Sequence, residues 1–298
     1  MLTSFKAVVE EAKKLQGKKI AVAGAEGKAV LEAVKLAKEN GLMEPILLGN
    51  EDKIETIAQR VGLSLKNIEI HHTVEEKATA EAAVGLIHFD IADGLMKGKV
   101  NTPILLKAIL DRKEELCTGP LLSHIALLEI STYHKFLMVT DGGMVIQPTL
   151  EQKSGILKNG IQMMQKLGVD RPKVAVLAAI ETITPGMPET KDAEILVQMA
   201  DRGELGDVDL EGPIAIDVAF SPESANIKGL SSKISGDPDI LLVPNISCGN
   251  IFVKGLWQLA NAKVGGLILG AKKPIILLSR SDTVETKFNS IALGVATS

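Results

Sequence analysis

The residues best suited to chemistry are a serine and an arginine at the end of an apolar run near the C-terminus. The run PIILLSR ends on Ser279 and Arg280, and a helical pattern follows it. A guanidinium offers a planar fork of donors that matches phosphate, and the hydroxyl beside it adds another donor. An alternative interpretation is structural. Ser281 or Asp282 would cap the following helix and Glu285 would complete a capping box, while the arginine pairs with a surface acid.

A second polar junction follows another apolar run, in GLMKGKVNT. Here Lys97 supplies a charge, Gly98 lets the backbone approach a ligand, and Thr102 can cap the next helix after Asn101. Successive side chains of a strand point to opposite faces, so at most one of Lys97 and Lys99 faces a given site. Lysines solvated on a loop are the alternative explanation.

A third junction, NISCGN, combines a strand end, a glycine and the start of a helix. Asn250, Lys254 and Gln258 share one face of that helix and could hold phosphate or a ligand with amide groups. An exposed polar face explains the same pattern. Cys248 has no histidine near it in the sequence, so we interpret it as a small packing residue.

Several motifs that would indicate other chemistry are missing from the sequence. The segment GAEGKA at 24–29 lacks the glycine spacing and the hydroxyl residue of a P-loop, and no GxGxxG follows the first predicted strand. His71 and His72 are neighbours on a predicted strand and would point to opposite faces. The sequence therefore predicts no metal site.

The elements that position these junctions alternate between short apolar runs and longer helical patterns such as 27–41 and 152–168. Most runs are continuously apolar, which is typical of strands that helices cover on both faces. This alternation predicts an α/β fold with mainly parallel sheets. The predicted strands are 19–25, 45–50, 68–73, 94–100, 135–141, 173–180, 212–220, 239–245, 264–270 and 274–280.

Composition limits the class of partner. The 298 residues include 33 Lys and Arg against 37 Asp and Glu, and only 3% are aromatic, so nucleic acid is not expected to bind. The two cysteines, Cys117 and Cys248, fit a reducing compartment. The N-terminus does not resemble a signal peptide, and no apolar run reaches the roughly 18 residues that a membrane span needs. We expect a cytoplasmic protein without a membrane partner.

Six ordered blocks of this sequence resemble the phosphate acetyl/butyryltransferase family, closest to its phosphate butyryltransferase (branched-chain phosphotransacylase) arm. Together they span nearly the whole chain. The blocks lie at residues 92–102, 140–153, 173–193, 212–221, 239–254 and 270–293.

The resemblance implies a fold like that of the isocitrate and isopropylmalate dehydrogenases, with two α/β lobes and the site in the cleft between them. Residues 1–121 and 270–298 would form the first lobe, which contains both termini, and residues 122–269 the second. The length of the chain also favours two domains. Members of the family act as homo-oligomers, so we expect one here.

The resemblance also implies the reaction: an acyl-CoA and inorganic phosphate give an acyl phosphate and CoA, without a metal or a permanently bound cofactor. By the same resemblance, Ser279 would stabilise or protonate the departing thiolate. Arg280 would bind phosphate and stabilise the oxyanion of the intermediate. The residues that match cleft-lining blocks, and so would bind phosphate or CoA, are Lys97, Asn101, Thr102 and Asn250.

Three positions depart from the pattern of the acetyl-type enzymes. Lys107 stands where they carry an arginine, Asn245 replaces an aspartate, and Thr286 lies near the position of an aspartate proposed as a base. Asp282 or Glu285 could replace that base, or the reaction could need no protein base. Met144 and Ile146 are candidates for the wall of an acyl pocket.

The expected substrate is a butyryl or branched short-chain acyl-CoA, and acetyl-CoA is the first alternative. A metal-dependent decarboxylating hydroxyacid dehydrogenase would need clustered aspartates and a Tyr–Lys pair, for which Tyr133 and Lys135 are the candidates. A non-catalytic domain that senses CoA is the third hypothesis, and retention of Ser279 and Arg280 argues against it.

Overall fold

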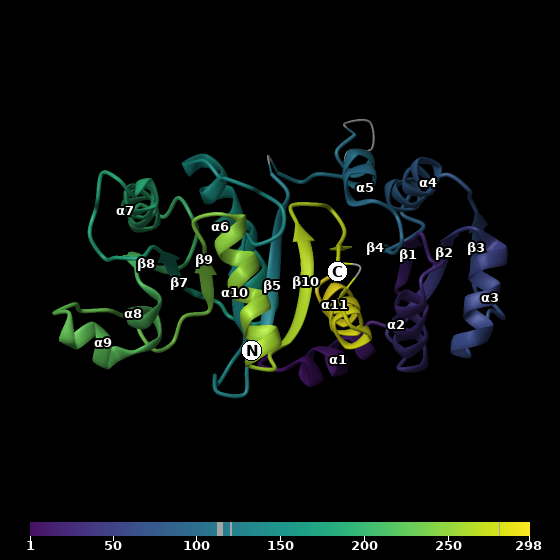
Figure 1. Ribbon diagram of the computed structural model, residues 1–298, viewed down its shortest axis with the longest axis horizontal. Helices are drawn as coiled ribbons and strands as arrows, with labels where there is room; N and C mark the ends of the chain where they lie inside the picture. Colours follow the sequence, from purple (N-terminus) through teal and green to yellow (C-terminus); the bar gives the residue numbers. More distant parts are fainter. Residues whose placement is uncertain (112–115, 120, 280) are drawn as a thin grey trace. The chain divides into compact units, whose positions relative to one another are not determined.

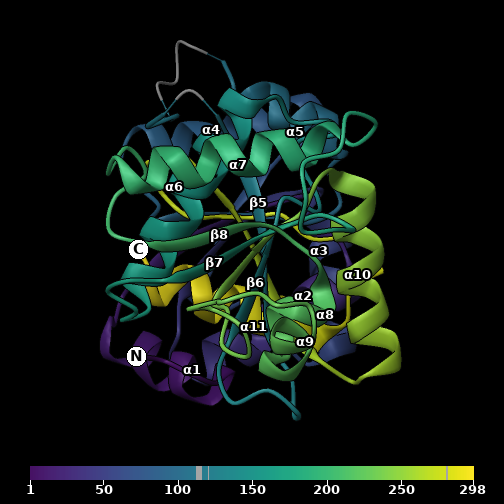
Figure 2. The ribbon, with the colours of Figure 1, turned by 90° about the vertical axis from the view of Figure 1, so that its left-hand side faces the viewer.

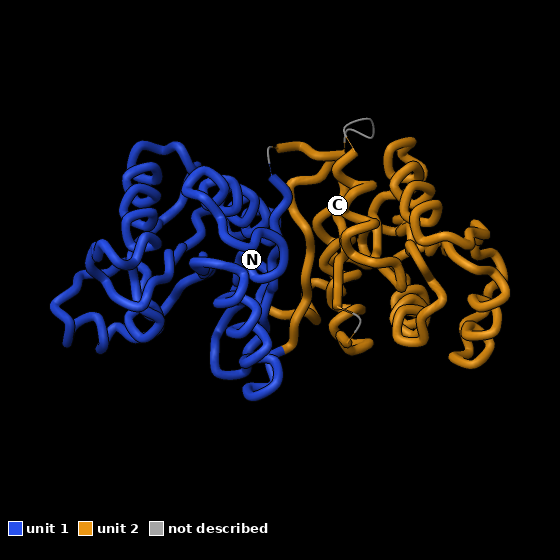
Figure 3. Tube along the Cα trace, turned by 45° about the horizontal axis from the view of Figure 1, so that its top comes forward, with its two compact units in different colours: residues 1–3, 121–262 blue, residues 4–120, 263–298 orange. Residues whose placement is uncertain are grey.

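The computed structural model describes residues 1–111, 116–119, 121–279 and 281–298. The chain forms two compact units, shown in Figure 3. We call residues 4–120 with 263–298 the terminal unit, and residues 1–3 with 121–262 the central unit.

The boundaries of the units differ from the expected lobes in two ways. Strand β10 (Lys263–Leu269) belongs to the terminal unit, where it pairs antiparallel with the next strand, β11 (Ile275–Ile276). The first three residues belong to the central unit, where the Leu2 amide donates to the Leu167 carbonyl at 2.8 Å. The two termini of the chain therefore lie in different units.

The terminal unit is built on strands in the order β3-β2-β1-β4-β11-β10. All the pairs are parallel except β10 with β11. Every residue of β4 is buried, as expected for a parallel strand with helices on both faces. The other four strands of this unit are β1 (Lys19–Ala23), β2 (Glu44–Gly49), β3 (Glu69–His72) and β4 (Gly94–Lys97).

Helices cover both faces of these strands. Figure 1 shows α4 and α5 on one side and α1, α2 and α11 on the other. Helix α11 is the most deeply buried, because nearly all its residues from Thr286 to Val295 are inaccessible to solvent. The helices of this unit are α1 (Phe5–Lys14), α2 (Lys28–Glu39), α3 (Glu51–Val61), α4 (Glu76–His88), α5 (Thr102–Ile109) and α11 (Val284–Ala296).

The central unit has strands in the order β5-β6-β9-β7-β8, and only β5 and β6 pair antiparallel. Figures 1 and 2 place α6 and α7 on one side of these strands and α8 and α9 on the other. The strands are β5 (Ser123–Glu129), β6 (Leu137–Thr140), β7 (Lys173–Leu177), β8 (Asp209–Ile214) and β9 (Ile240–Leu242). The helices are α6 (Leu150–Lys166), α7 (Pro188–Asp201), α8 (Ile216–Phe220), α9 (Pro222–Ile227) and α10 (Ile246–Leu259).

The predicted α/β class with mainly parallel strands is confirmed, and two details of the prediction are wrong. Strand β5 was not predicted. The run predicted as one strand over 212–220 is the end of β8 followed by helix α8. Short apolar runs have no period long enough to separate a strand from a buried helix. Over the described residues, none of the helices is both long enough and apolar enough to cross a membrane.

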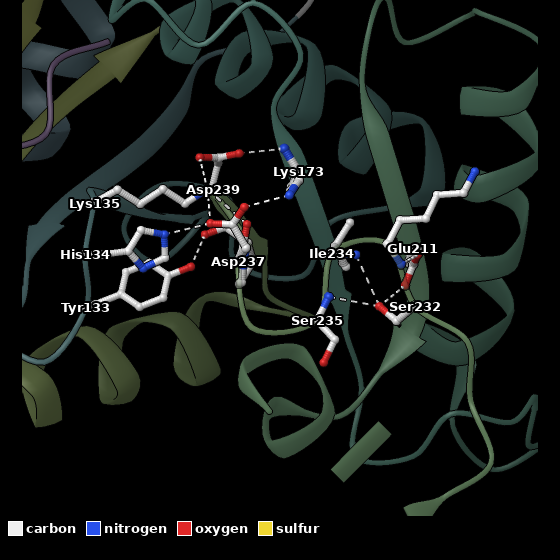
Figure 4. A network of polar contacts seen from close by, with 12 residues as sticks. Tyr133, His134, Lys135, Lys173, Glu211, Ser232, Ile234, Ser235, Asp237 and Asp239 are labelled. Carbon is white, nitrogen blue, oxygen red and sulfur yellow. Dashed lines mark hydrogen bonds and ion pairs between the residues drawn. The ribbon is translucent and has the colours of Figure 1, made fainter. Parts of the chain in front are cut away.

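A network of charged side chains joins the amino ends of three strands in the central unit (Figure 4). The Lys135 ammonium, before β6, lies 2.8 Å from the Asp237 carboxylate and 2.7 Å from that of Asp239, both before β9. At the start of β7, the Lys173 side chain donates to Asp237 at 2.6 Å and its amide donates to Asp239 at 2.7 Å. Lys135 and Asp239 are buried, so we interpret the network as a structural one that connects the strands at this edge of the sheet.

Candidate functional site

Ser279 lies at the carboxyl edge of the terminal unit, three residues after strand β11. Its side chain is exposed, and its hydroxyl lies 3.0 Å from that of Ser281. Its amide donates to the Asp282 carboxylate at 2.7 Å, which closes a tight loop between the two residues. The loop therefore presents the Ser279 hydroxyl to solvent while Asp282 fixes the backbone. Arg280 lies outside the described residues.

The Lys287 side chain binds the same loop through hydrogen bonds. This lysine of α11 is buried, and its ammonium donates to the carbonyls of Ser279 at 3.2 Å and Asp282 at 2.7 Å. Burial lowers the pKa of Lys287, and the nearby Asp282 carboxylate opposes that shift. One ammonium thus binds both ends of the loop that carries Ser279.

The residue that caps α11 is not the one that the sequence predicts. Thr283 is the N-cap, and its hydroxyl accepts from the Thr286 amide at 3.1 Å. The predicted cap from Ser281 or Asp282 is therefore wrong, and Glu285 is an exposed acid in the first turn. The carboxylate of Asp282 is used instead to bind the Ser279 amide, so the expected cap and capping box are wrong. The expected pairing of Arg280 with an acid falls outside the described residues.

Lys97 reaches the same edge from the neighbouring strand. Strand β4, which ends at Lys97, pairs parallel with β11 through Met96 and Ile276. The Lys97 side chain is only 4% exposed, and its ammonium donates to the Gly98 carbonyl at 3.3 Å. Because both strands end at one edge of the sheet, Lys97, the last residue of β4, and Ser279, three residues after β11, lie at adjacent strand ends.

Two glycines fix the backbone beside Lys97. The Gly98 amide donates to the Ala23 carbonyl at 2.8 Å, and the Lys99 amide donates to that of Gly24 at 2.7 Å. A Cβ on Gly98 would lie 2.1 Å from the Gly24 oxygen, so the crossing of these two chain segments accepts only glycine.

The segment after this crossing begins α5. Asn101 is the N-cap, so the predicted cap at Thr102 is wrong, and Thr102 is the first residue of the helix. The Asn101 amide donates to the Glu76 carboxylate at 2.9 Å, which ties α5 to the start of α4. Both residues lie at the same edge of the terminal unit as Lys97.

In the central unit, a buried aspartate shapes the loop after β6. One oxygen of Asp141 accepts from the amides of Gly143 and Met144, both at 2.8 Å, and the other accepts from the His124 amide at 2.9 Å. The Asn250 side chain of α10 donates to the Gly142 carbonyl at 3.3 Å. Asn250 therefore belongs to the carboxyl edge of the central unit, and Lys254 and Gln258 are exposed on the same helix.

A cavity of about 510 Å³ lies at this edge of the central unit. It is bounded by the ends of β7 and β9 and by the first turns of α7 and α10. Cys248 is exposed and lines it, so its interpretation as a packing residue is wrong. Asn245 caps α10 by accepting from the Cys248 amide at 3.1 Å and lines the cavity too. The predicted wall residues Met144 and Ile146 do not line this cavity, and Ile146 is 73% exposed.

A family model described as Phosphate acetyl/butaryl transferase matches residues 4–84 and 71–295. The chain belongs to this family. The resemblance that the six sequence blocks indicated is confirmed.

Three similar proteins cover nearly the full chain. It is 40% identical to a phosphate butyryltransferase of Clostridium acetobutylicum over 98% of its own length and 97% of that protein. It is 41% identical to a phosphate acetyltransferase of Thermotoga maritima over 93% and 94%. The crystal structure of a branched-chain phosphotransacylase from Enterococcus faecalis matches with a TM-score of 0.84 at 34% identity, covering 94% of this chain and 98% of that one. Relatives of the butyryl and acetyl types are therefore about equally similar to this chain.

The structure shows the surroundings of two residues, Thr286 and Lys107, at which this chain departs from the acetyl-type pattern of the family. Thr286 is buried, and its hydroxyl lies 3.1 Å from that of Thr283, so this position contributes to the cap of α11. Lys107 is exposed on α5 and lines a cavity of about 670 Å³ with residues of α4.

Sequence reasoning missed two buried lysines beside the candidate site residues. Lys287 lies on the buried face of α11, and Lys153 lies on the buried face of α6 with Ile156 and Leu157. The spacing of residues along each helix could have identified these lysines. A lysine that shares a helix face with apolar residues is expected to be buried, and a buried ammonium needs a partner. The Lys153 ammonium finds Asp192 of α7 at 2.7 Å.

Proposed function

We propose that this chain transfers a short acyl group, butyryl or branched, between CoA and inorganic phosphate. Membership of the phosphate acetyl/butyryltransferase family supports the reaction class. The observation that carries the proposal is the exposed Ser279 hydroxyl on a loop fixed by Asp282 and Lys287, beside the end of β4.

The proposed reaction is a direct attack in a ternary complex. A phosphate oxygen attacks the thioester carbonyl carbon and forms a tetrahedral oxyanion. Collapse of this intermediate breaks the carbon–sulfur bond, which leaves an acyl phosphate and the CoA thiolate, and the thiolate takes up a proton. Phosphate is itself a competent nucleophile, so the protein has mainly to position it and to stabilise charge.

The roles of the residues follow this reaction. Ser279 would donate to the departing thiolate, and Arg280 would bind phosphate and stabilise the oxyanion. Lys97 would add positive charge at the same strand edge. Asn101 and Thr102, at the start of α5, and Asn250, on α10, would contribute polar contacts to phosphate or CoA. Because Asp282 is engaged with the Ser279 amide and Glu285 is in a helix turn, we assign no protein base.

The direct test is turnover by the purified chain. With butyryl-CoA and millimolar phosphate, we expect free thiol and acyl phosphate to appear in equal amounts, measured with a thiol reagent and by hydroxamate formation. Without phosphate, thiol release should stop. Absence of thiol release with every acyl-CoA from two to six carbons would contradict the proposal, and acetyl-CoA as the best substrate would favour the acetyl alternative.

Lys287 provides a prediction about the loop. Lys287→Met removes the donor to both carbonyls, so Ser279 loses its fixed position, and we expect kcat to fall on the order of 100-fold. Lys287→Arg should recover part of the rate because it restores donors. Steady-state kinetics and circular dichroism check this. An unchanged kcat in a folded Lys287→Met variant would limit the lysine to a role in stability.

A dehydrogenase is the second candidate, and the contacts of its key residues argue against it. The Tyr133 hydroxyl donates to the Pro238 carbonyl at 2.7 Å, and Lys135 is paired with Asp237 and Asp239. The Tyr133 hydroxyl and the Lys135 ammonium lie at the amino ends of β6 and β9, and each connects the loop before β6 to the loop before β9. Reduction of a nicotinamide cofactor by hydroxyacids, followed by absorbance, tests this candidate. Binding of CoA without turnover would instead favour the non-catalytic sensing domain.

The expected cleft between two lobes like those of isocitrate and isopropylmalate dehydrogenases remains a prediction, as does a cytoplasmic location. We also propose a homo-oligomer, which helix α10 supports. Of its residues, all of them described, only Gly249 is buried, while Ile251 is 72% and Leu259 is 88% exposed. A helix this apolar is typical of an interface between subunits.

The oligomer is tested by light scattering coupled to size-exclusion chromatography. We expect the wild type to elute as an oligomer and Leu259→Asp to shift toward the monomer, because a buried charge opposes association. Ile227→Asp is the control, since Ile227 is 79% exposed in the same unit but lies on α9. A monomeric wild type would contradict the proposal.

A further inference from the structure

The cavity of the central unit has walls that suit an apolar ligand. Leu177, Ala178, Val243, Pro244, Ile216 and Phe252 form much of its lining. Its volume of about 510 Å³ falls within the roughly 300–1,000 Å³ that is usual for sites that bury a small molecule. A four-carbon acyl chain would fill only a fraction of this space, so the cavity has room for more of the ligand than the chain itself.

The charges of the cavity do not suit an anion. Its one lysine, Lys153, is 4% exposed and is paired with Asp192 at 2.7 Å, and Glu189 adds a second carboxylate to the lining. One ammonium against two carboxylates leaves the wall negative. Phosphate and the diphosphate of CoA would be repelled here, whereas a neutral arm would not.

Two side-chain amides complete the lining. Gln147 lies at the rim and is exposed. Asn245 uses its oxygen on the Cys248 amide, and within the described residues its amide nitrogen has no hydrogen-bond partner. Such groups can pair with the amides of a ligand and orient it, while the apolar walls enclose its hydrocarbon part.

We propose that this cavity holds the acyl chain and the adjoining pantetheine arm of the acyl-CoA, and that its apolar walls set the preferred chain length. The proposal rests on the proposed function. It assigns the neutral, apolar end of the substrate to the cavity because the walls exclude its charged end.

The two cysteines allow a direct test of occupancy. Both are free and exposed, but Cys248 lines the cavity whereas Cys117 lies in the terminal unit. The protein is treated with N-ethylmaleimide without phosphate, and alkylation at each cysteine is followed by mass spectrometry. We expect butyryl-CoA to slow alkylation of Cys248 at least ten-fold, acetyl-CoA to slow it less and desulfo-CoA, which has no thiol that would consume the reagent, to slow it least, while Cys117 reacts at one rate throughout.

A substitution that narrows the cavity provides the second test. Ala178→Leu adds bulk to the wall, so we expect kcat/KM for butyryl-CoA to fall at least ten-fold more than that for acetyl-CoA, since one methylene changes kcat/KM by about ten-fold or more. Ala200→Leu is the matched control, because Ala200 is partly exposed like Ala178 and belongs to the same unit, but lies near the end of α7, outside the cavity and not on α10.

The outcomes separate this inference from the proposed function. If the wild type converts butyryl-CoA but Cys248 is unprotected, or protected equally by desulfo-CoA and by every acyl-CoA, the inference is wrong and the function stands. Equal loss toward acetyl-CoA and butyryl-CoA in a folded Ala178→Leu variant would also overturn it. If Cys248 is protected in order of chain length but no acyl phosphate forms, the cavity assignment stands and the proposed function fails.

Discussion

Arg280→Ala should lower kcat by about 100- to 1,000-fold and raise the KM for phosphate, while the fold is retained. This is the usual loss when one donor to a developing oxyanion is removed. The guanidinium is expected to act on both the bound phosphate and the tetrahedral intermediate, so both kinetic constants should change. Initial rates of thiol release over a range of phosphate concentrations measure them.

Two variants sharpen this experiment. Arg280→Lys keeps the charge but loses the planar fork, so it should recover only part of the rate. Arg202→Ala removes an exposed arginine that pairs with Glu204, and its kinetics should match the wild type. A near-normal rate for Arg280→Ala would remove Arg280 from the site.

Lys135→Met should lower the free energy of unfolding by about 3–5 kcal/mol, because it leaves the buried carboxylate of Asp239 without its ammonium. Urea denaturation followed by circular dichroism measures this loss. Adding Asp239→Asn to the variant should recover part of the stability, since the charge disappears and the Lys173 amide keeps an acceptor.

The matched control is Lys228→Met in the same unit. The Lys228 ammonium also contacts two carboxylates, those of Glu181 at 2.8 Å and Asp217 at 3.0 Å, but the side chain is 37% exposed. Exposed pairs contribute roughly 0–1 kcal/mol, so this variant should unfold nearly as the wild type does. Equal losses in both lysine variants would contradict the role of burial.

The same network predicts sensitivity to acid. Desolvation raises the pKa of Asp237, but hydrogen bonds from Lys135, Lys173 and His134 outweigh it and hold the pKa below its ordinary value. A carboxylate with a lowered folded pKa stabilises the protein above its unfolded pKa of about 3.9 and loses that contribution as the pH falls through the folded value. Stability should therefore decline below about pH 4, and Asp237→Asn should decline less steeply.

The sequence predicted the class of fold because its strands are continuously apolar and separated by helices. It could not predict β5, whose apolar run carries no period that separates strand from helix. It also could not predict that residues 216–220 leave the strand for helix α8. The antiparallel pairing of β10 with β11, and the place of β10 in the terminal unit, depend on contacts that local patterns do not encode.

The candidate site was predictable where it follows strand ends and unpredictable where it depends on distant contacts. Ser279 and Lys97 could be selected because each follows an apolar run. Lys287 could not be selected, because its contact with the Ser279 carbonyl exists only once α11 packs against the loop. The pairing of Lys153 with Asp192 joins residues 39 positions apart, so the cavity could not be assembled from sequence alone.

The charged network and the cavity lie at opposite ends of β7, which spans five residues, or about 15 Å of extended chain. Random mutagenesis could exploit this spacing. Libraries confined to the loops before the strands should yield heat-tolerant variants whose acyl-CoA selectivity is unaltered, and libraries confined to the loops after them should yield new selectivities at little cost in melting temperature.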